Sequence, residues 1–155
     1  MRSNADELRL DPNRIIASGN SSGAMAPLFM TYESVGWCQE GNSGTPGEDS
    51  NPNGVVSISG WYHEPWIKDI GTSEAHPPLI QLTWTQDTWT PYAKIPKAIH
   101  EQAQRVGMDS TLISLEGSSH GDLNLIMTSH YFTDLTTSMY EHVTNGAQAP
   151  DGCSL

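Results

Sequence analysis

The 155-residue sequence is poor in positive charge. Seven Lys and Arg stand against eighteen Asp and Glu, which gives a net charge of −11. A surface of that charge repels phosphate backbones and anionic lipids, so nucleic acid is excluded as a partner. No apolar run approaches the roughly 20 residues that span a bilayer, and residues 1–10 lack the apolar stretch of a signal peptide. We therefore expect a soluble chain with no membrane partner, and the acidic, lysine-poor composition leans toward a secreted or extracellular location.

Cysteine is scarce as well. Cys38 and Cys153 lie far apart, which fits either a disulfide that ties down the C-terminal tail or two unrelated thiols. The sequence has neither C-x-x-C nor H-E-x-x-H spacing, and the pair His63-Glu64 is weak support for a metal site. We expect no metal and no cofactor.

The order of apolar patterns predicts one α/β domain over residues 1–155, because strand patterns alternate with helical ones as in parallel βαβ units. The expected strands are residues 14–18, 55–59, 79–83 and 111–115. The expected helices cover 24–35, a stretch with an apolar face from Ile95 to Val106 that ends at Gly107, and one from about Phe132 to Gly146. The Gly-, Asn- and Ser-rich residues 37–53 are too long for a plain connector and indicate a functional loop or an insertion.

A G-x-S-x-G motif lies between the first strand and its helix, in the segment from Gly19 to Gly23. This strand-turn-helix context is the one that the nucleophile elbow of a hydrolase requires. There Ser21 would be exposed at a sharp turn, flanked by Gly19 and Gly23, and the N–H of Ser22 would point toward a developing oxyanion. The plainer alternative is a Gly/Ser-rich turn.

A serine nucleophile needs a histidine to take its proton and a carboxylate to orient that histidine. Asp87 follows the strand 79–83, and His120 follows the strand 111–115. Both therefore lie at C-terminal strand ends, where the elbow also lies. The other carboxylates that could serve are Glu64 and Asp69, after the strand 55–59, while the remaining histidines, in polar loops or on helix faces, are His63, His76, His100, His130 and His142.

Several tryptophans gather near the expected strand ends. They are expected either to form an apolar wall for a substrate or to belong to the ordinary core. These residues are Trp61, Trp66, Trp84 and Trp89.

Taken together, these motifs resemble the α/β-hydrolase superfamily, in particular its small carboxylesterases and its feruloyl or acetyl-xylan esterase-like members. The resemblance covers nearly the whole chain and rests on Asp11-Pro12-Asn13-Arg14-Ile15, the elbow, the segment from Glu40 to Gly47, Asp87 four residues before Pro91, and the segment from Gly117 to Gly121. It implies a mostly parallel sheet flanked by helices. It also implies a two-step acyl transfer in which Ser21 is the nucleophile, His120 the base and Asp87 its partner, with the Ser22 N–H as an oxyanion donor.

The sequence also departs from that pattern. The family sheet has eight strands, so the resemblance predicts that the first four are missing here, together with the His-Gly-Gly loop that supplies a second oxyanion donor. Thr83-Trp84 stands where the family has His-Gly before the acid, and Ala24 replaces a glycine that peptidases of the prolyl-oligopeptidase type favour after the elbow. The strand 14–18 would then be an exposed edge, which pairs with a second copy or with a missing N-terminal half.

The leading hypothesis is a serine esterase with a small-molecule ester substrate. The alternatives are a non-catalytic or partner-dependent remnant of the fold and a prolyl-oligopeptidase-like peptidase. Loss of one oxyanion donor typically lowers the rate by about 10²- to 10³-fold, so weak activity is expected even with a complete triad.

Overall fold

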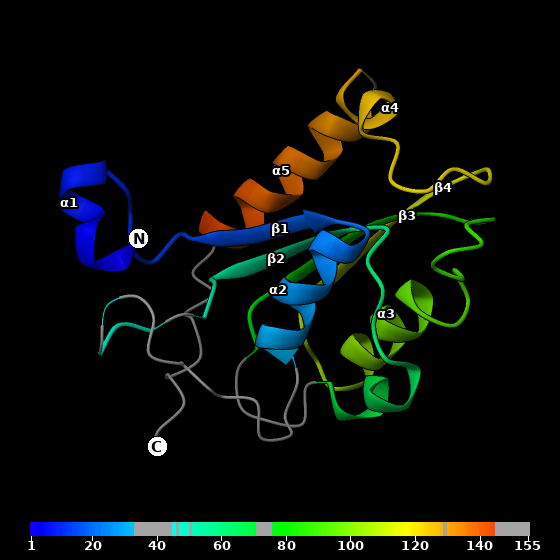
Figure 1. Ribbon diagram of the computed structural model, residues 1–155, viewed down its shortest axis with the longest axis horizontal. Coiled ribbons are helices and arrows are strands. Elements are labelled where there is room, and N and C mark those ends of the chain that lie inside the picture. Colours follow the sequence, from blue (N-terminus) through cyan, green and yellow to red (C-terminus); the bar gives the residue numbers. More distant parts are fainter. Residues whose placement is uncertain (33–44, 46, 50, 71–75, 129, 145–155) are drawn as a thin grey trace.

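A four-stranded, all-parallel sheet forms the centre of the protein (Figure 1). The computed structural model describes residues 1–32, 45, 47–49, 51–70, 76–128 and 130–144. The strands lie side by side in chain order, which is the arrangement of successive right-handed crossovers. They are β1 (Ile16–Asn20), β2 (Gly54–Ile58), β3 (Leu79–Trp84) and β4 (Ser110–Leu115). Cys38, Cys153, Gly146 and most of the loop 37–53 lie outside the described residues.

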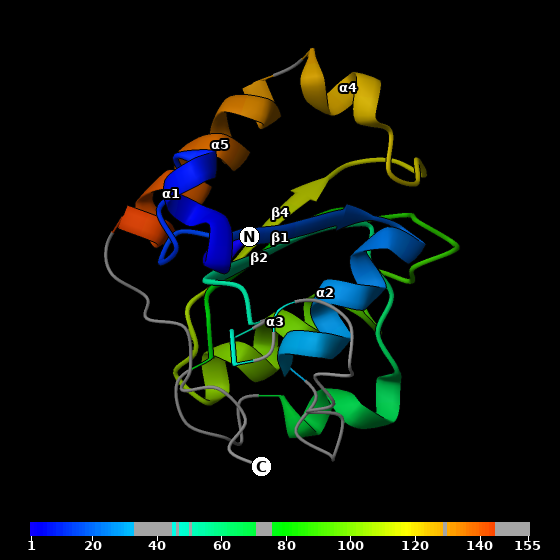
Figure 2. The same ribbon diagram turned by 60° about the vertical axis from the view of Figure 1, so that its left-hand side comes forward.

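Helices cover both faces of this sheet (Figure 2). On one face lie α2 (Ser22–Tyr32) and α3 (Pro96–Arg105), and on the other lie α4 (Leu123–Met127) and α5 (His130–Thr144). Because successive strand residues point to opposite faces, each strand supplies apolar side chains to two separate layers. Leu79 packs under α2 and α3, for example, while Ile80 packs against Leu135 of α5.

The β1 strand begins two residues later than the sequence predicts. Asp11 explains the shift, because its carboxylate accepts a hydrogen bond from the N–H of Asn13 at 2.9 Å and contacts the Arg14 guanidinium at 3.2 Å. The Arg14 N–H also donates to the Asp11 carbonyl at 3.1 Å. This Asx turn includes Arg14, the first residue that the apolar pattern assigned to the strand.

The predicted elements are otherwise confirmed to within about two residues at each described end. The α3 helix buries Ile99 and Ala103 on one face and is followed by Gly107 at φ +74°, the left-handed conformation that commonly ends helices. The sequence analysis did not predict four short elements: η1 (Arg2–Asn4), α1 (Ala5–Leu8), η2 (Glu64–Asp69) and α4.

β1 is an edge strand, and its residues are only half-buried or exposed, whereas all six residues of β3 are buried. The expected open edge at this strand is therefore present in the described structure. Among the described helices, none has the length and apolarity needed to cross a bilayer.

Candidate active site

The turn between β1 and α2 has the backbone of a nucleophile elbow. Ser21 has φ +53°, a left-handed conformation that residues other than glycine rarely adopt. Its N–H donates to the Ile58 carbonyl at 2.8 Å, and its carbonyl accepts from the Ala24 N–H at 3.0 Å. These two bonds hold the strained residue between β2 and the first turn of α2. Strain that is fixed in this way is typical of functional sites.

The two motif glycines have different roles. A Cβ atom at Gly19 would lie 2.1 Å from the Gly23 carbonyl oxygen, so only glycine allows helix α2 to approach the strand this closely. A Cβ at Gly23 would meet nothing within 4 Å. Close packing therefore requires glycine at position 19, whereas the structure gives no steric reason for glycine at position 23.

Asp87 lies three residues beyond the end of β3 and is buried. Its Oδ1 atom accepts hydrogen bonds from the backbone N–H groups of Trp89, at 2.8 Å, and Thr90, at 3.0 Å. Its Oδ2 atom lies 2.6 Å from Nδ1 of His120. The short turn after β3 therefore fixes the carboxylate from one side and leaves the other oxygen facing the histidine.

His120 joins the three strand ends. Its Nδ1 faces Asp87, and its Nε2 lies 2.7 Å from Oγ of Ser21. The side chain is 24% exposed, while that of Asp87 is fully buried. The structure thus brings Ser21, His120 and Asp87 together at hydrogen-bond distances, with the histidine ring between the serine hydroxyl and the carboxylate.

The other candidate acids and histidines lie elsewhere. Glu64 is exposed in η2, and Asp69 is the last residue of that element. His63 packs against Trp66, and His100 contacts Ser110 at 2.9 Å. Of the remaining histidines, His76 packs near Tyr32, His130 is exposed at the start of α5, and the side chain of His142 lies outside the described residues.

The tryptophans divide into three environments. Trp84 is 1% exposed and packs with Leu82 and Leu115, so it belongs to the core and does not form a substrate wall. Trp61 and Trp66 pack around Phe29 on the α2 face. Of the four tryptophans that the structure describes, Trp89 alone lies beside His120; it is 79% exposed, with its ring centroid 6.3 Å from that of His120.

The N-terminus of α2 adds a hydrogen-bond donor next to Ser21. Ser22 is exposed and is the first residue of the helix, so its N–H belongs to the first turn, whose N–H groups have no partner inside a helix. This position suits an anion beside the Ser21 hydroxyl. Across the part of the chain that the structure describes, no group of three or more His, Cys, Asp or Glu is placed to hold a metal ion.

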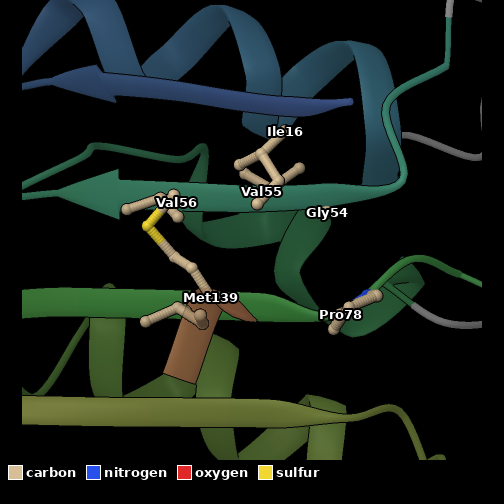
Figure 3. A pocket seen from close by; sticks show the side chains of 7 residues that line it. Ile16, Gly54, Val55, Val56, Pro78 and Met139 are labelled. Carbon is tan, nitrogen blue, oxygen red and sulfur yellow. The ribbon is translucent and has the colours of Figure 1, made fainter. Parts of the chain in front are cut away.

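A small apolar hollow lies at the opposite end of the sheet (Figure 3). It is lined by residues at the N-terminal ends of the strands, including Ile16, Gly54 and Pro78, and Met139 of α5 reaches over Val56 beside it. Its lining carries no nucleophile or titratable group. We therefore interpret it as loose packing under α5.

Sequence reasoning missed Asn20, Ser59 and Thr90, which surround the triad. Thr90 donates from its backbone to Asp87 and from its hydroxyl to the Ser59 carbonyl, at 3.0 Å in each case. Asn20 and Ser59 both bond to Gly121, the residue after His120. None of the three titrates. The sequence signal was limited to position, since Asn20 and Ser59 lie at or just after the ends of predicted strands and Thr90 lies in the loop that contains Asp87.

Comparison with known proteins bears on the fold. No family model and no curated protein matches the sequence. Solved structures do match: a truncated carbohydrate esterase from gut microbiota superposes with a TM-score of 0.68 at 20% identity, over 92% of this chain and 64% of that one. A propionate-bound thermophilic esterase from Thermogutta terrifontis gives a TM-score of 0.66 at 21% identity, over 97% and 63%. An acetyl ester-xyloside bifunctional hydrolase from Caldicellulosiruptor lactoaceticus gives 0.69 at 18% identity, over 92% and 61%.

These matches, together with an α/β hydrolase from a deep-sea metagenome library at a TM-score of 0.64, define the fold. The chain has part of the α/β-hydrolase fold: four parallel strands with helices on both faces. It spans between three fifths and two thirds of the length of the structures that it matches. The predicted resemblance in fold is confirmed.

Proposed function

We propose that this chain is a serine hydrolase that cleaves carboxylic esters through Ser21, His120 and Asp87. The observation that carries the proposal is the continuous contact from Ser21 Oγ through the His120 ring to the Asp87 carboxylate, at 2.7 and 2.6 Å. A histidine with only a packing or solvated role would not be expected to contact a serine hydroxyl with one ring nitrogen and a buried carboxylate with the other. The backbone strain at Ser21 and the strand-end positions of all three residues support the same function.

The chemistry proceeds in two halves. His120 Nε2 takes the Ser21 hydroxyl proton as Oγ attacks the ester carbonyl carbon, and it then gives that proton to the leaving alcohol oxygen. Water attacks the acyl-serine in the second half, again losing its proton to Nε2, and the Ser21 oxygen leaves and regains a proton. Asp87 holds the Nδ1–H tautomer throughout and stabilises the imidazolium.

The Ser22 N–H is the proposed oxyanion donor because it lies at the start of α2 beside Ser21. Hydrolases of this fold use two such donors, and removal of one typically lowers the rate by about 10²- to 10³-fold. We assign a single donor within the described residues. We therefore expect slow ester turnover, although His120 would activate the Ser21 hydroxyl normally.

The substrate class follows from the site and its relatives. The names of the matched structures include a carbohydrate esterase, an acetyl ester hydrolase and an esterase with bound propionate. We propose short acyl groups on a small or sugar alcohol, of the kind found in plant cell walls. The exposed ring of Trp89, beside His120, would form an aromatic wall next to the leaving alcohol.

Turnover of p-nitrophenyl acetate, propionate and octanoate tests this function. We expect acetate and propionate to be hydrolysed faster than octanoate, and the activity to vanish in Ser21→Ala and His120→Gln. Ser18→Ala is the matched control, since Ser18 is an exposed serine on β1, the strand that precedes Ser21, and lies outside the proposed triad. Turnover of the Ser21→Ala variant equal to that of the unmodified chain would contradict the proposal, and preferred cleavage of a prolyl p-nitroanilide would move the assignment to a peptidase.

A partner-dependent hydrolase is the second candidate. It is favoured by the half-exposed edge strand β1. An open strand edge presents unpaired backbone groups, which suit a strand from a second copy or from a separate N-terminal half. Sedimentation velocity separates the cases, because this candidate predicts concentration-dependent dimers and a turnover that rises with them. A dilute monomer with full activity contradicts it.

A further inference from the structure

Gly121, the residue after His120, is held through both of its backbone polar groups. Its N–H donates to the Ser59 hydroxyl at 3.1 Å, and its carbonyl accepts from Nδ2 of Asn20 at 3.1 Å. Gly121 is buried and has φ +63°. A Cβ atom there would lie 2.0 Å from Oδ1 of Asn20, so the loop has room only for glycine. The histidine loop is therefore fixed at a single point by two side chains.

Ser59 contacts two of the three loops that carry the triad. It follows the last residue of β2, is 1% exposed, and has φ +47°. Its N–H donates to the Leu82 carbonyl at 2.8 Å, which holds it against β3. Its carbonyl accepts from the Thr90 hydroxyl in the acid turn, and its own hydroxyl accepts from Gly121 in the histidine loop. One strained residue thus connects the supports of Asp87 and His120.

Asn20 connects the remaining loop. It is the last residue of β1 and directly precedes Ser21, so its side chain links the nucleophile turn to the histidine loop. A side-chain amide is needed here because the bond requires a donor toward the Gly121 carbonyl. The described structure thus joins the three strand ends through Asn20, Ser59 and Thr90, independently of the triad's own contacts.

We infer that Ser59 and Asn20 are positioning residues that set the His120 ring between Ser21 and Asp87. The inference rests on the proposed hydrolase function. A left-handed residue other than glycine costs of order 1–3 kcal/mol and persists where the surroundings fix it. At Ser59 the hydroxyl gives a reason to keep a serine where glycine would be relaxed. Reacting groups need placement within about 0.5 Å, and a 1 Å displacement can lower a rate by about 10²-fold.

Two substitutions at Ser59 separate the hydroxyl from the strain. Ser59→Ala removes the acceptor and keeps the strained side chain, whereas Ser59→Gly removes the acceptor and relaxes the backbone. We expect both variants to lose about 10- to 100-fold in kcat for p-nitrophenyl acetate, with KM changed by less than about threefold. Ser59→Gly should also retain the folded structure. A merely structural role predicts normal kcat in any variant that folds.

Asn20→Asp is the second test, and it can be used even when the Ser59 variants do not fold. The substitution keeps the shape but replaces the donor with an acceptor that faces the Gly121 carbonyl, and we expect a similar loss of kcat. Thr83→Val is the control, because the buried Thr83 hydroxyl has no hydrogen-bond partner among the described residues and its loss should leave kcat unchanged. Proton NMR gives a direct readout, since the low-field signal of the His120–Asp87 hydrogen bond should shift or broaden in the positioning variants and remain in the control.

The two proposals fail in different ways. If the unmodified chain neither hydrolyses p-nitrophenyl esters nor reacts at Ser21 with a fluorophosphonate, the hydrolase function is overturned. Full kcat and an unchanged low-field signal in folded Ser59→Gly or Asn20→Asp, in a chain that does hydrolyse esters, would overturn only the positioning role.

Discussion

The two carboxylate oxygens of Asp87 have separate partners. Oδ1 accepts from two backbone N–H groups, and Oδ2 faces Nδ1 of His120. The surroundings therefore fix which oxygen is available to the histidine. A substitution at Asp87 therefore tests the proposed control of the His120 tautomer while it leaves Ser21 in place.

Asp87→Asn should abolish most activity without loss of the fold. Its amide oxygen must take the Oδ1 position, since two N–H groups point there, so the NH₂ group then donates to Nδ1 of His120. Nε2 must then carry the proton and cannot take one from Ser21. We expect a fall in kcat of about 10⁴-fold, as for the equivalent change in serine proteases. Steady-state kinetics with Glu64→Gln as control test this, and an equal loss in the control would move the acid to η2.

A second residue-scale prediction concerns His76. Burial lowers the pKa of His76 below its ordinary value, and a hydrogen bond with the Thr31 backbone partly opposes that change. The unfolded chain therefore binds the proton more readily than the folded one. The stability due to neutral His76 is present above about pH 6.5 and is lost as the pH falls through the lower folded pKa. Urea unfolding between pH 7.5 and 5 should show a smaller pH dependence for His76→Gln than for the unmodified chain, and equal dependences would refute this.

At the scale of elements, the turn from β1 into α2 carries the serine of the candidate site. The sequence predicted a strand, a turn and a helix here, and the structure shows that α2 starts two residues earlier than expected, at Ser22. The apolar pattern begins only at Ala24, so periodicity could not locate the first turn. That turn nevertheless provides the proposed oxyanion donor.

The two elbow glycines give opposite predictions. Gly19→Ala should destabilise the fold by about 1–3 kcal/mol or more, because its Cβ would collide with the backbone of α2. Gly23→Ala should raise stability by about 0.5–1 kcal/mol, since it lies within α2 and its Cβ meets nothing. Urea unfolding of both variants checks this pair. Similar losses of stability would show that the approach of helix and strand is not limited by Gly19.

At the scale of the whole molecule, the sequence predicted the sheet better than the side chains that surround the contact between Ser21, His120 and Asp87. These three belong to reactive residue types at the ends of patterned strands, so spacing selected them as candidates, and their catalytic role stays a prediction. Ser59 and Asn20 act through hydrogen bonds to a residue far along the chain. Trp84 and Trp89 looked alike in sequence, yet one is core and the other is exposed, because neighbouring loops decide burial. The short α4 helix has exposed Leu123 and Met127 and so lacks an apolar face to detect.

Covalent labelling of Ser21 tests the central claim most directly. A fluorophosphonate reacts with an activated serine to give a stable covalent adduct, so it reports the proposed nucleophile even where turnover is slow. Purified protein treated with a fluorophosphonate and digested should carry the label on the peptide with Ser21, and the label should be absent in Ser21→Ala and strongly reduced in Asp87→Asn. Labelling elsewhere, or none in a folded sample, would contradict an activated serine in this part of the fold.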